Sequence, residues 1–396
     1  MRYRSLTFLV LFAILSLAPA AEPVRNTSTQ TTGGTASIAT SSLHFPTTPL
    51  RRPDGHRWRL GYVGSGDYDE YLDTLRAIVQ GLQKLGWLSV PEVPDALDSQ
   101  QLWQFLATHA KSEYVEFVAD AWWQPGQFDT SQRSALRRSL AHRLSVTRDI
   151  DLLIAMGTWA GQDIVALGAP VPTIVAAASD PVRTHIIRSA QDSGLDNLHV
   201  RIDPGHYERQ LRVFHDVVPF RRLGLVHENT QEGKTYSALH AAQDVARSLG
   251  FEVVTCTAPW NGISLVQATQ HVLQCYQQLT TDTDAVYVTA HRGITRDSIK
   301  DIAQILREAR IPGFSMLGTA AVHHGILLSL SQADTSYLGM FYANTIAQIF
   351  HGARPRQLNQ IWPEPTTLVI NMETARSIGF DPPVNALLAA DEIIDD

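Results

Sequence analysis

The chain has 396 residues, 44% of them hydrophobic and only 18% charged, with a net charge of −7. A chain of this length can bury a large core, and its acidity argues against a protein that binds nucleic acid through the phosphate backbone. Two cysteines exclude a disulfide-rich scaffold and a multi-cysteine zinc site.

The N-terminal 20 residues have the pattern of a signal peptide. Two arginines precede an apolar run over residues 6–17, and Ala-Pro-Ala follows at 18–20. We predict cleavage near residue 20 and a periplasmic protein that is soluble after cleavage; the alternative is an uncleaved anchor. Residues 21–55 are rich in Thr and Ser, which predicts a flexible leader.

From residue 57 onward, apolar runs alternate with stretches of helical periodicity. We expect strands at 58–63, 114–119, 151–156, 172–178, 222–227, 252–257, 285–289 and 313–317. We expect helices at 68–85, 131–146, 158–167, 205–218, 234–249, 264–279 and 295–309. Apolar strands between helices indicate parallel sheets covered on both faces. The two series of strands therefore predict an α/β fold with two doubly wound parallel-sheet lobes.

Ligands of such sheets bind beyond the carboxyl ends of the strands. This rule selects the ligand-binding candidates Ser65, Asp67, Tyr68, Trp122, Trp123, Gly157, Thr158, Trp159, Ser179, Glu228, Asn229, Thr289, His291, Arg292, Met316 and Thr319. Thr158 begins a helix whose free N–H groups suit a carboxylate, or it is only an N-cap. The three tryptophans line an aromatic pocket, or they pack between the helices and the sheet rim.

Motifs for catalysis are missing from the sequence. There is no G-x-S-x-G, H-E-x-x-H or G-x-x-x-x-G-K-[ST] pattern, so we expect neither an enzyme nor a cofactor. His323 and His324 are adjacent, and adjacent side chains do not converge easily on a metal ion. Cys256 and Cys275 form an even pair in an exported chain, which makes a disulfide between them plausible.

The order and spacing of several stretches resembles the periplasmic substrate-binding proteins of ABC importers. These stretches are residues 151–162, 172–182, 222–226, 284–288, 311–314 and 368–371. The resemblance is to the branch with tryptophan- and tyrosine-type binders, and it covers about residues 57–385. It implies two lobes of the type I periplasmic binding protein fold, joined by a three-segment hinge. The N-terminal lobe would comprise 56–198 and 318–355, and the C-terminal lobe 199–317 and 356–396.

The resemblance also implies roles for individual residues. Hydroxyls and N–H groups near Thr158 and Ser179 would hold a ligand carboxylate. An acid that would hold the ammonium is replaced here by Ala290-His291-Arg292, and an arginine cannot pair with an ammonium. We therefore expect a small, partly apolar or aromatic ligand, an inner-membrane ABC permease as partner, no nucleic acid, and a monomer. The alternative is a ligand sensor or a lipid- or sterol-like carrier with the same fold.

Overall fold

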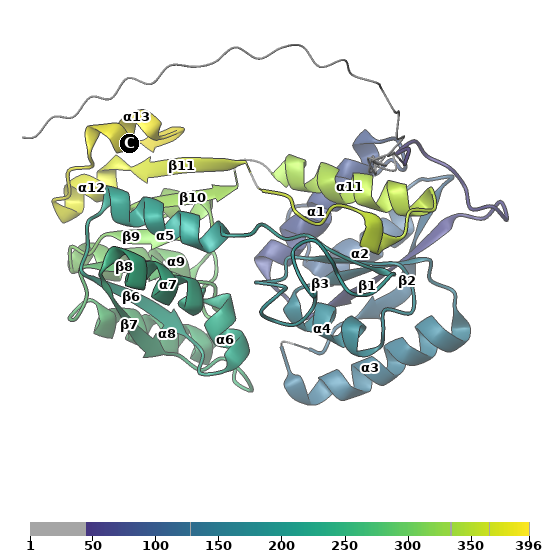
Figure 1. Ribbon diagram of the computed structural model, residues 1–396, viewed down its shortest axis with the longest axis horizontal. Coiled ribbons are helices and arrows are strands. Elements are labelled where there is room, and N and C mark those ends of the chain that lie inside the picture. Colours follow the sequence, from purple (N-terminus) through teal and green to yellow (C-terminus); the bar gives the residue numbers. More distant parts are fainter. Residues whose placement is uncertain (1–44, 127, 333–334, 364, 396) are drawn as a thin grey trace, which may run out of the picture. The chain divides into compact units, whose positions relative to one another are not determined.

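The computed structural model describes residues 45–126, 128–332, 335–363 and 365–395 (Figure 1). The expected signal peptide and most of the expected leader lie outside this part of the chain. Residues 45–52, which we expected to be flexible, are held by side chains of the folded domain. Trp87 Nε1 donates to the carbonyl of Thr47 at 2.9 Å, and Arg52 pairs with Asp151 at 2.8 Å. The ordered domain thus begins before residue 56.

The first sheet has five parallel strands in the order β2-β1-β3-β4-β5. They are β1 (Trp58–Gly64), β2 (Val115–Trp123), β3 (Leu152–Met156), β4 (Thr173–Ala176) and β5 (Leu198–Val200). The central strands β3 and β4 are buried at every position, because helices cover both faces of the sheet. The expected parallel sheet is confirmed.

Two groups of helices cover this sheet. One face is covered by α1 (Asp69–Lys84), α2 (Ser99–His109) and α11 (Thr335–Phe350), whose leucines, isoleucines and aromatic rings form one core cluster with the sheet. The other face is covered by α3 (Arg133–His142) and α4 (Thr158–Ala166), which form a second cluster. Short helical segments flank α3 at Thr130–Gln132 and Arg143–Thr147.

The second sheet has seven strands in the order β12-β11-β10-β9-β8-β6-β7, and only β10 and β11 pair antiparallel. The strands are β6 (Arg222–His227), β7 (Glu252–Thr257), β8 (Ala285–Val288), β9 (Gly313–Ser315), β10 (Leu328–Gln332), β11 (Thr366–Asn371) and β12 (Glu392–Ile394). This sheet and its helices form the second lobe.

Helices also cover both faces of the second sheet. The core on one face includes α5 (His206–Val217) and α7 (Leu239–Leu249), together with α12 (Met372–Ile378) and α13 (Val384–Ala389). The core on the other face includes α8 (Leu265–Leu279) and α9 (Ser298–Glu308). The short helices α6 (Gln231–Tyr236) and α10 (Thr319–His323) follow β6 and β9, and a last short turn lies at Pro355–Gln357.

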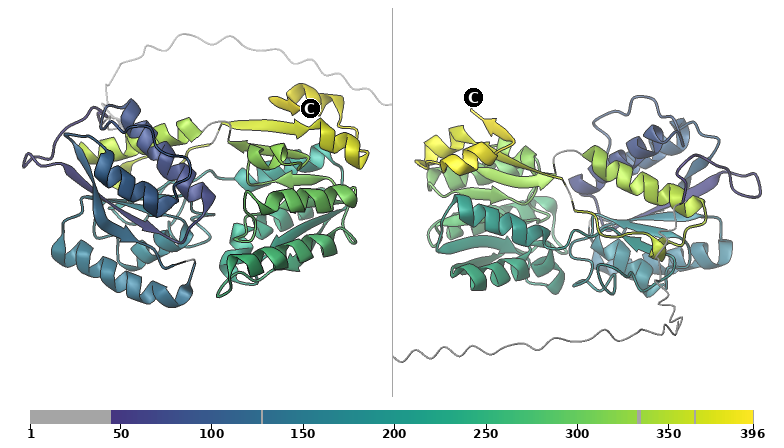
Figure 2. Two further views of the ribbon diagram at one scale, coloured as in Figure 1. Left: turned by 180° about the vertical axis from the view of Figure 1, so that it is seen from behind. Right: turned by 45° about the horizontal axis from the view of Figure 1, so that its top comes forward.

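The chain passes between the sheets three times: between β5 and α5, between β10 and α11, and between α11 and β11. Figure 2 shows α11, in yellow-green, back at the first lobe, where it packs on α1. We expected the chain to return from the second lobe to the first at residue 318, and this boundary is too early. Strand β10 hydrogen-bonds to β9 and β11, so residues up to 332 belong with the second sheet.

Candidate functional site

The loops after β1, β3 and β4 bring three hydroxyl side chains together. Ser65 is buried, and its Oγ donates to the carbonyl of Met156 at 3.0 Å and accepts from the Ala160 N–H at 3.1 Å. Thr158 Oγ1 accepts from the Ser179 N–H at 3.1 Å. The carboxyl-end rule thus brings Ser65, Thr158 and Ser179 to one edge of the first sheet, as predicted.

Gly157 allows this close approach. It has a φ of +90°, which L side chains rarely adopt, and it immediately precedes α4. A Cβ atom at this position would lie 2.6 Å from Ser65 Oγ and would also clash with the Tyr71 hydroxyl. The hydroxyl of Tyr71, from the first turn of α1, lies on the other side of this position, beside Ser65. Only glycine fits between these two hydroxyls.

Two tyrosines of the second lobe contact the same edge. The Tyr207 side chain of α5 lies beside Ser179, and that of Tyr236, the last residue of α6, lies beside Thr158, and each hydroxyl lowers the pKa of the neighbouring phenol. Burial raises the pKa of both phenols well above their ordinary value, so both stay protonated at neutral pH and can donate hydrogen bonds. We call Ser65, Tyr71, Thr158, Ser179, Tyr207 and Tyr236 the hydroxyl cluster.

An ion pair also links the two lobes. Arg296, in the loop before α9, lies 2.9 Å from a carboxylate oxygen of Asp73 and 3.5 Å from one of Asp69, one turn apart on α1. The three side chains are largely exposed, so the pair contributes little to folding stability. Because Arg296 and the two aspartates lie on different lobes, this ion pair forms only when the lobes are close together.

Two polar candidates of the second lobe, Glu228 and Arg292, hydrogen-bond the backbone of one loop. The Glu228 carboxylate accepts from the N–H groups of Trp260 and Asn261 at 3.3 and 3.0 Å. Arg292 donates to the carbonyls of Trp260 and Ile263 at 3.1 and 2.8 Å. This loop places the Trp260 ring against Tyr236 of the hydroxyl cluster, with 5.6 Å between the ring centroids.

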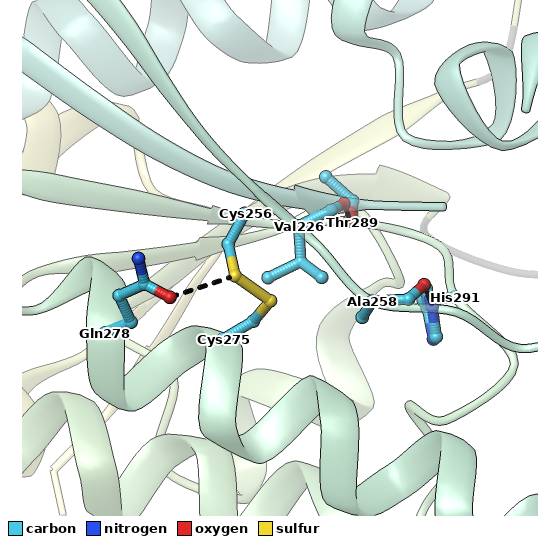
Figure 3. Close-up of a disulfide and its surroundings, with 7 residues drawn as sticks. All are labelled: Val226, Cys256, Ala258, Cys275, Gln278, Thr289 and His291. Atoms are coloured by element: carbon cyan, nitrogen blue, oxygen red, sulfur yellow. Dashed lines mark hydrogen bonds between the residues drawn. A yellow bond between two sulfur atoms is a disulfide. The ribbon is translucent and has the colours of Figure 1, made fainter. Parts of the chain in front are cut away.

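His291 is a neutral structural residue. Its Nδ1 accepts from the Gly293 N–H at 3.0 Å, so the proton is on Nε2, which donates to the Ala258 carbonyl at 2.9 Å. Burial lowers the pKa of His291 to about 4. Figure 3 shows His291 beside Ala258, on the loop near the disulfide. Nearby, the Thr289 hydroxyl donates to the Val226 carbonyl at 2.6 Å.

The predicted disulfide between Cys256 of β7 and Cys275 of α8 is confirmed, with 5.5 Å between the Cα atoms (Figure 3). It ties the edge strand of the second sheet to the helix that follows it. Gln278 Oε1 lies 3.6 Å from Cys256 Sγ. The bond has no direct contact with the hydroxyl cluster, so its role is structural.

The three tryptophans do not form one aromatic wall. Trp122 stacks on Tyr62 with 4.1 Å between ring centroids, whereas Trp123 packs in the core of the opposite face, where its Nε1 donates to Ser139. Strand β2 extends to Trp123, and successive residues of a strand point to opposite faces. Trp159 is buried under the guanidinium of Arg133, 4.8 Å from the ring centroid.

The remaining predicted ligand-binding residues lie at separate places in the two lobes. Asp67 accepts from the Ser99 hydroxyl at 3.3 Å, and Tyr68 makes an edge contact with Tyr71 at 5.5 Å. Met316 Sδ accepts from the Ala290 N–H at 2.9 Å. Asn229 is exposed, and Thr319 is the first residue of α10. Of these, only Tyr68 touches the hydroxyl cluster through an observed contact.

Sequence reasoning missed Tyr71, Tyr207 and Tyr236, half of the hydroxyl cluster. All three lie within helices, whereas the rule for strand ends selected the residues directly after each strand. Tyr71 lies in the first turn after the β1 loop, and Tyr207 in the first turn of α5. A first-turn position directly after a strand could have selected Tyr71 and Tyr207, whereas Tyr236 is the last residue of α6 and has no such signal.

Comparison with known proteins supplies the family. The model described as ABC transporter substrate binding protein matches residues 125–394, more than half of the chain. The chain belongs to this family. A tyrosine-binding protein of Clostridioides difficile is 22% identical over 276 residues, which are 68% of this chain and 76% of that protein.

Solved structures of substrate-binding proteins share the fold. A domain from Streptococcus pneumonia in complex with L-Trp is 19% identical, with a TM-score of 0.65 over 85% of this chain and all of that one. A ligand-free, open substrate-binding protein with adhesive properties from Clostridium difficile is 16% identical, with a TM-score of 0.55 over 86% of this chain and all of that one. These likenesses confirm the type I bilobal fold.

No helix among the described residues combines the length and the apolar character that crossing a bilayer requires. Within the same residues, no three His, Cys, Asp or Glu side chains are grouped so that they could hold a metal ion.

Proposed function

We propose that this ABC substrate-binding protein is exported to the periplasm, captures a small ligand with an aromatic or partly apolar body between its two lobes, and delivers it to an ABC importer. The observation that carries the proposal is the hydroxyl cluster. Ser65, Thr158 and Ser179 come from the strand ends of the first lobe, and Tyr207 and Tyr236 reach them from the second.

The chemistry of the cluster supports such a ligand. Neutral hydroxyls both donate and accept hydrogen bonds, so they suit a carboxylate, an amide or a hydroxyl of the ligand. The rings of Tyr71, Tyr236 and Trp260 supply apolar faces beside these groups. The names of the tyrosine-binding relative and of the L-Trp complex point to the same ligand class.

Capture couples to closure of the lobes. Tyr236 and Tyr207 lie beside Thr158 and Ser179, so a polar group of the ligand can bridge these pairs of hydroxyls. Three crossing segments join the lobes and allow a hinge movement. A ligand that contacts both lobes stabilises the arrangement in which they face each other.

The test begins with native mass spectrometry of the exported protein, followed by a thermal-shift screen of aromatic amino acids and related aromatic acids. A ligand at a hundred times its Kd stabilises the fold by about 2.7 kcal/mol, so the midpoint should rise. Thr158→Val and Tyr236→Phe each remove one hydroxyl and should weaken binding about tenfold.

Matched controls are Thr281→Val and Tyr337→Phe, whose side chains are exposed and outside the hydroxyl cluster. They should bind like the unmodified protein. A protein that carries no bound mass and shows no shift with any compound contradicts ligand capture. Binding that survives both cluster substitutions unchanged would place the ligand elsewhere.

A further inference from the structure

One charged contact between the lobes lies outside the hydroxyl cluster. Nη2 of Arg296 lies 3.2 and 2.9 Å from the two carboxylate oxygens of Asp73, and Nε lies 3.5 Å from a carboxylate oxygen of Asp69. Arg296 belongs to the loop between β8 and α9, and both aspartates belong to α1. One guanidinium of the second lobe therefore contacts two carboxylates of the first.

The two aspartates are close to each other as well as to Arg296. They are four residues apart on α1, so their side chains are neighbours on one face of the helix, where like charges repel. The start of α1 also carries Asp67, whose pKa is raised by burial and further by the charges of Asp98 and Asp69. A cation that reaches this face relieves the repulsion, and separation of the lobes restores it.

The loop that carries Arg296 is held in place on the second lobe. The Thr295 N–H donates to Ser298 Oγ at 2.8 Å, and the Ser298 hydroxyl donates to the Gly293 carbonyl at 2.9 Å. Gly293 lies against α8, where an added Cβ atom would be 2.4 Å from the Ala268 carbonyl oxygen. The backbone on both sides of Arg296 is therefore fixed, so the guanidinium moves with the second lobe.

The two aspartates are in turn fixed to the site of the first lobe. Asp69 and Asp73 flank Tyr71 of the hydroxyl cluster on α1. Tyr71 is buried, whereas both aspartates are exposed, because helical residues two apart face different sides. The movement that brings the second lobe to the hydroxyl cluster therefore also brings Arg296 to the aspartates.

We propose that Arg296, Asp69 and Asp73 form an interlobe latch that raises the fraction of closed protein and thereby the affinity for the ligand. The latch forms only when the lobes are close, so it favours closure whether or not a ligand is bound. Affinity falls in proportion to the fraction of protein that is competent to bind. The inference rests on the proposed function and adds a regulation of the same site by ionic strength, because salt screens exposed charges.

The first experiment measures the distance between the lobes without any ligand. Spin labels at Lys84→Cys and Glu308→Cys lie at the ends of α1 and α9 that are remote from the latch, and both native cysteines are in the disulfide. The screening length is about 30 Å in about 0.01 M salt and about 3 Å in about 1 M salt. The closed share should be larger at low salt, and Arg296→Gln should give the high-salt distribution in both.

The second experiment is isothermal titration of the full mature chain with L-tyrosine and L-tryptophan, the amino acids named for two similar proteins. At low salt, Arg296→Gln and Asp73→Asn should each weaken binding about two- to fivefold, as expected for an exposed ion pair. The double variant should bind no more weakly than Arg296→Gln alone, because Asp73 has already lost its partner. At about 1 M salt the differences should disappear.

The matched control is Arg247→Gln. Arg247 is exposed and pairs with Asp244 of the same helix, α7, so this ion pair does not depend on the lobes. The control should leave both the distances and the affinity unchanged. All variants should unfold at the same urea concentration, because a latch acts on closure and not on folding.

Two results overturn the inference. One is a distribution of distances at low salt that Arg296→Gln leaves unchanged. The other is a loss of affinity in the two single variants that adds up in the double variant. If neither amino acid binds, the proposed ligand class fails, and the distances without ligand still decide whether the latch exists.

Discussion

At the scale of single residues, the site depends on a close approach between the backbone at Gly157 and two hydroxyl side chains of the same lobe. Gly157 has a positive φ and lies between the hydroxyls of Ser65 and Tyr71. Neighbouring candidates serve the backbone instead: His291 and Arg292 satisfy carbonyls of the loop that carries Trp260. Some polar residues after a strand therefore belong to the hydroxyl cluster and others hydrogen-bond the backbone of a loop. Their contacts in the structure distinguish the two kinds.

We predict that Gly157→Ala destabilises the fold by about 1–3 kcal/mol and also abolishes ligand binding, because the added Cβ displaces Ser65 and Tyr71. Urea unfolding and titration measure the two effects. The matched control is Gly168→Ala, since Gly168 also has a positive φ, of +73°, but no atom lies within 4 Å of the added Cβ. Equal losses in the two variants would contradict the steric explanation.

At the scale of elements, the disulfide ties an exposed edge. β7 is the edge strand of the second sheet, so only one neighbouring strand, β6, holds it by hydrogen bonds, and its residues are partly or fully exposed. Cys256 and Cys275 connect it to α8 over a separation of 19 residues. The crosslink limits how far this edge can separate in the unfolded chain.

Replacing both cysteines with serine should lower the free energy of unfolding by about 3 kcal/mol, as expected for a loop of this length. Reduction of the unmodified protein should give a similar loss, measured by urea unfolding with and without a reductant. Ligand affinity should stay unchanged, because the disulfide does not touch the hydroxyl cluster. A loss of binding without a loss of stability would show that the bond has a role in the site.

Much of the element pattern could be predicted from the sequence, because buried parallel strands are short continuous apolar runs such as residues 152–156. Two strands, β5 and β10, could not be predicted, because they are defined by pairing with strands elsewhere in the chain. The pairing of β10 keeps residues up to 332 in the second lobe. The prediction that the three tryptophans line one pocket was wrong because of where β2 ends. Trp122 and Trp123 extend β2, so the strand sends them to opposite cores.

At the scale of the whole molecule, polar contacts join the two lobes. They include the approach of Tyr207 and Tyr236 to Ser179 and Thr158 and the exposed pair of Arg296 with Asp69 and Asp73. Contacts of this kind are individually weak, and salt screens the ion pair. A ligand with polar groups for both lobes can therefore shift the balance between separated and closed lobes.

The most direct test of this account measures the distance between the lobes with and without ligand. Both native cysteines are in the disulfide, so Lys84→Cys on α1 and Lys300→Cys on α9 provide unique thiols for a pair of spin labels. The account predicts that a ligand found in the thermal-shift screen narrows the distribution of distances and moves it to one closed value, and that Tyr236→Phe requires more ligand for the same change. A ligand that binds tightly and leaves the distribution unchanged would contradict capture between the lobes.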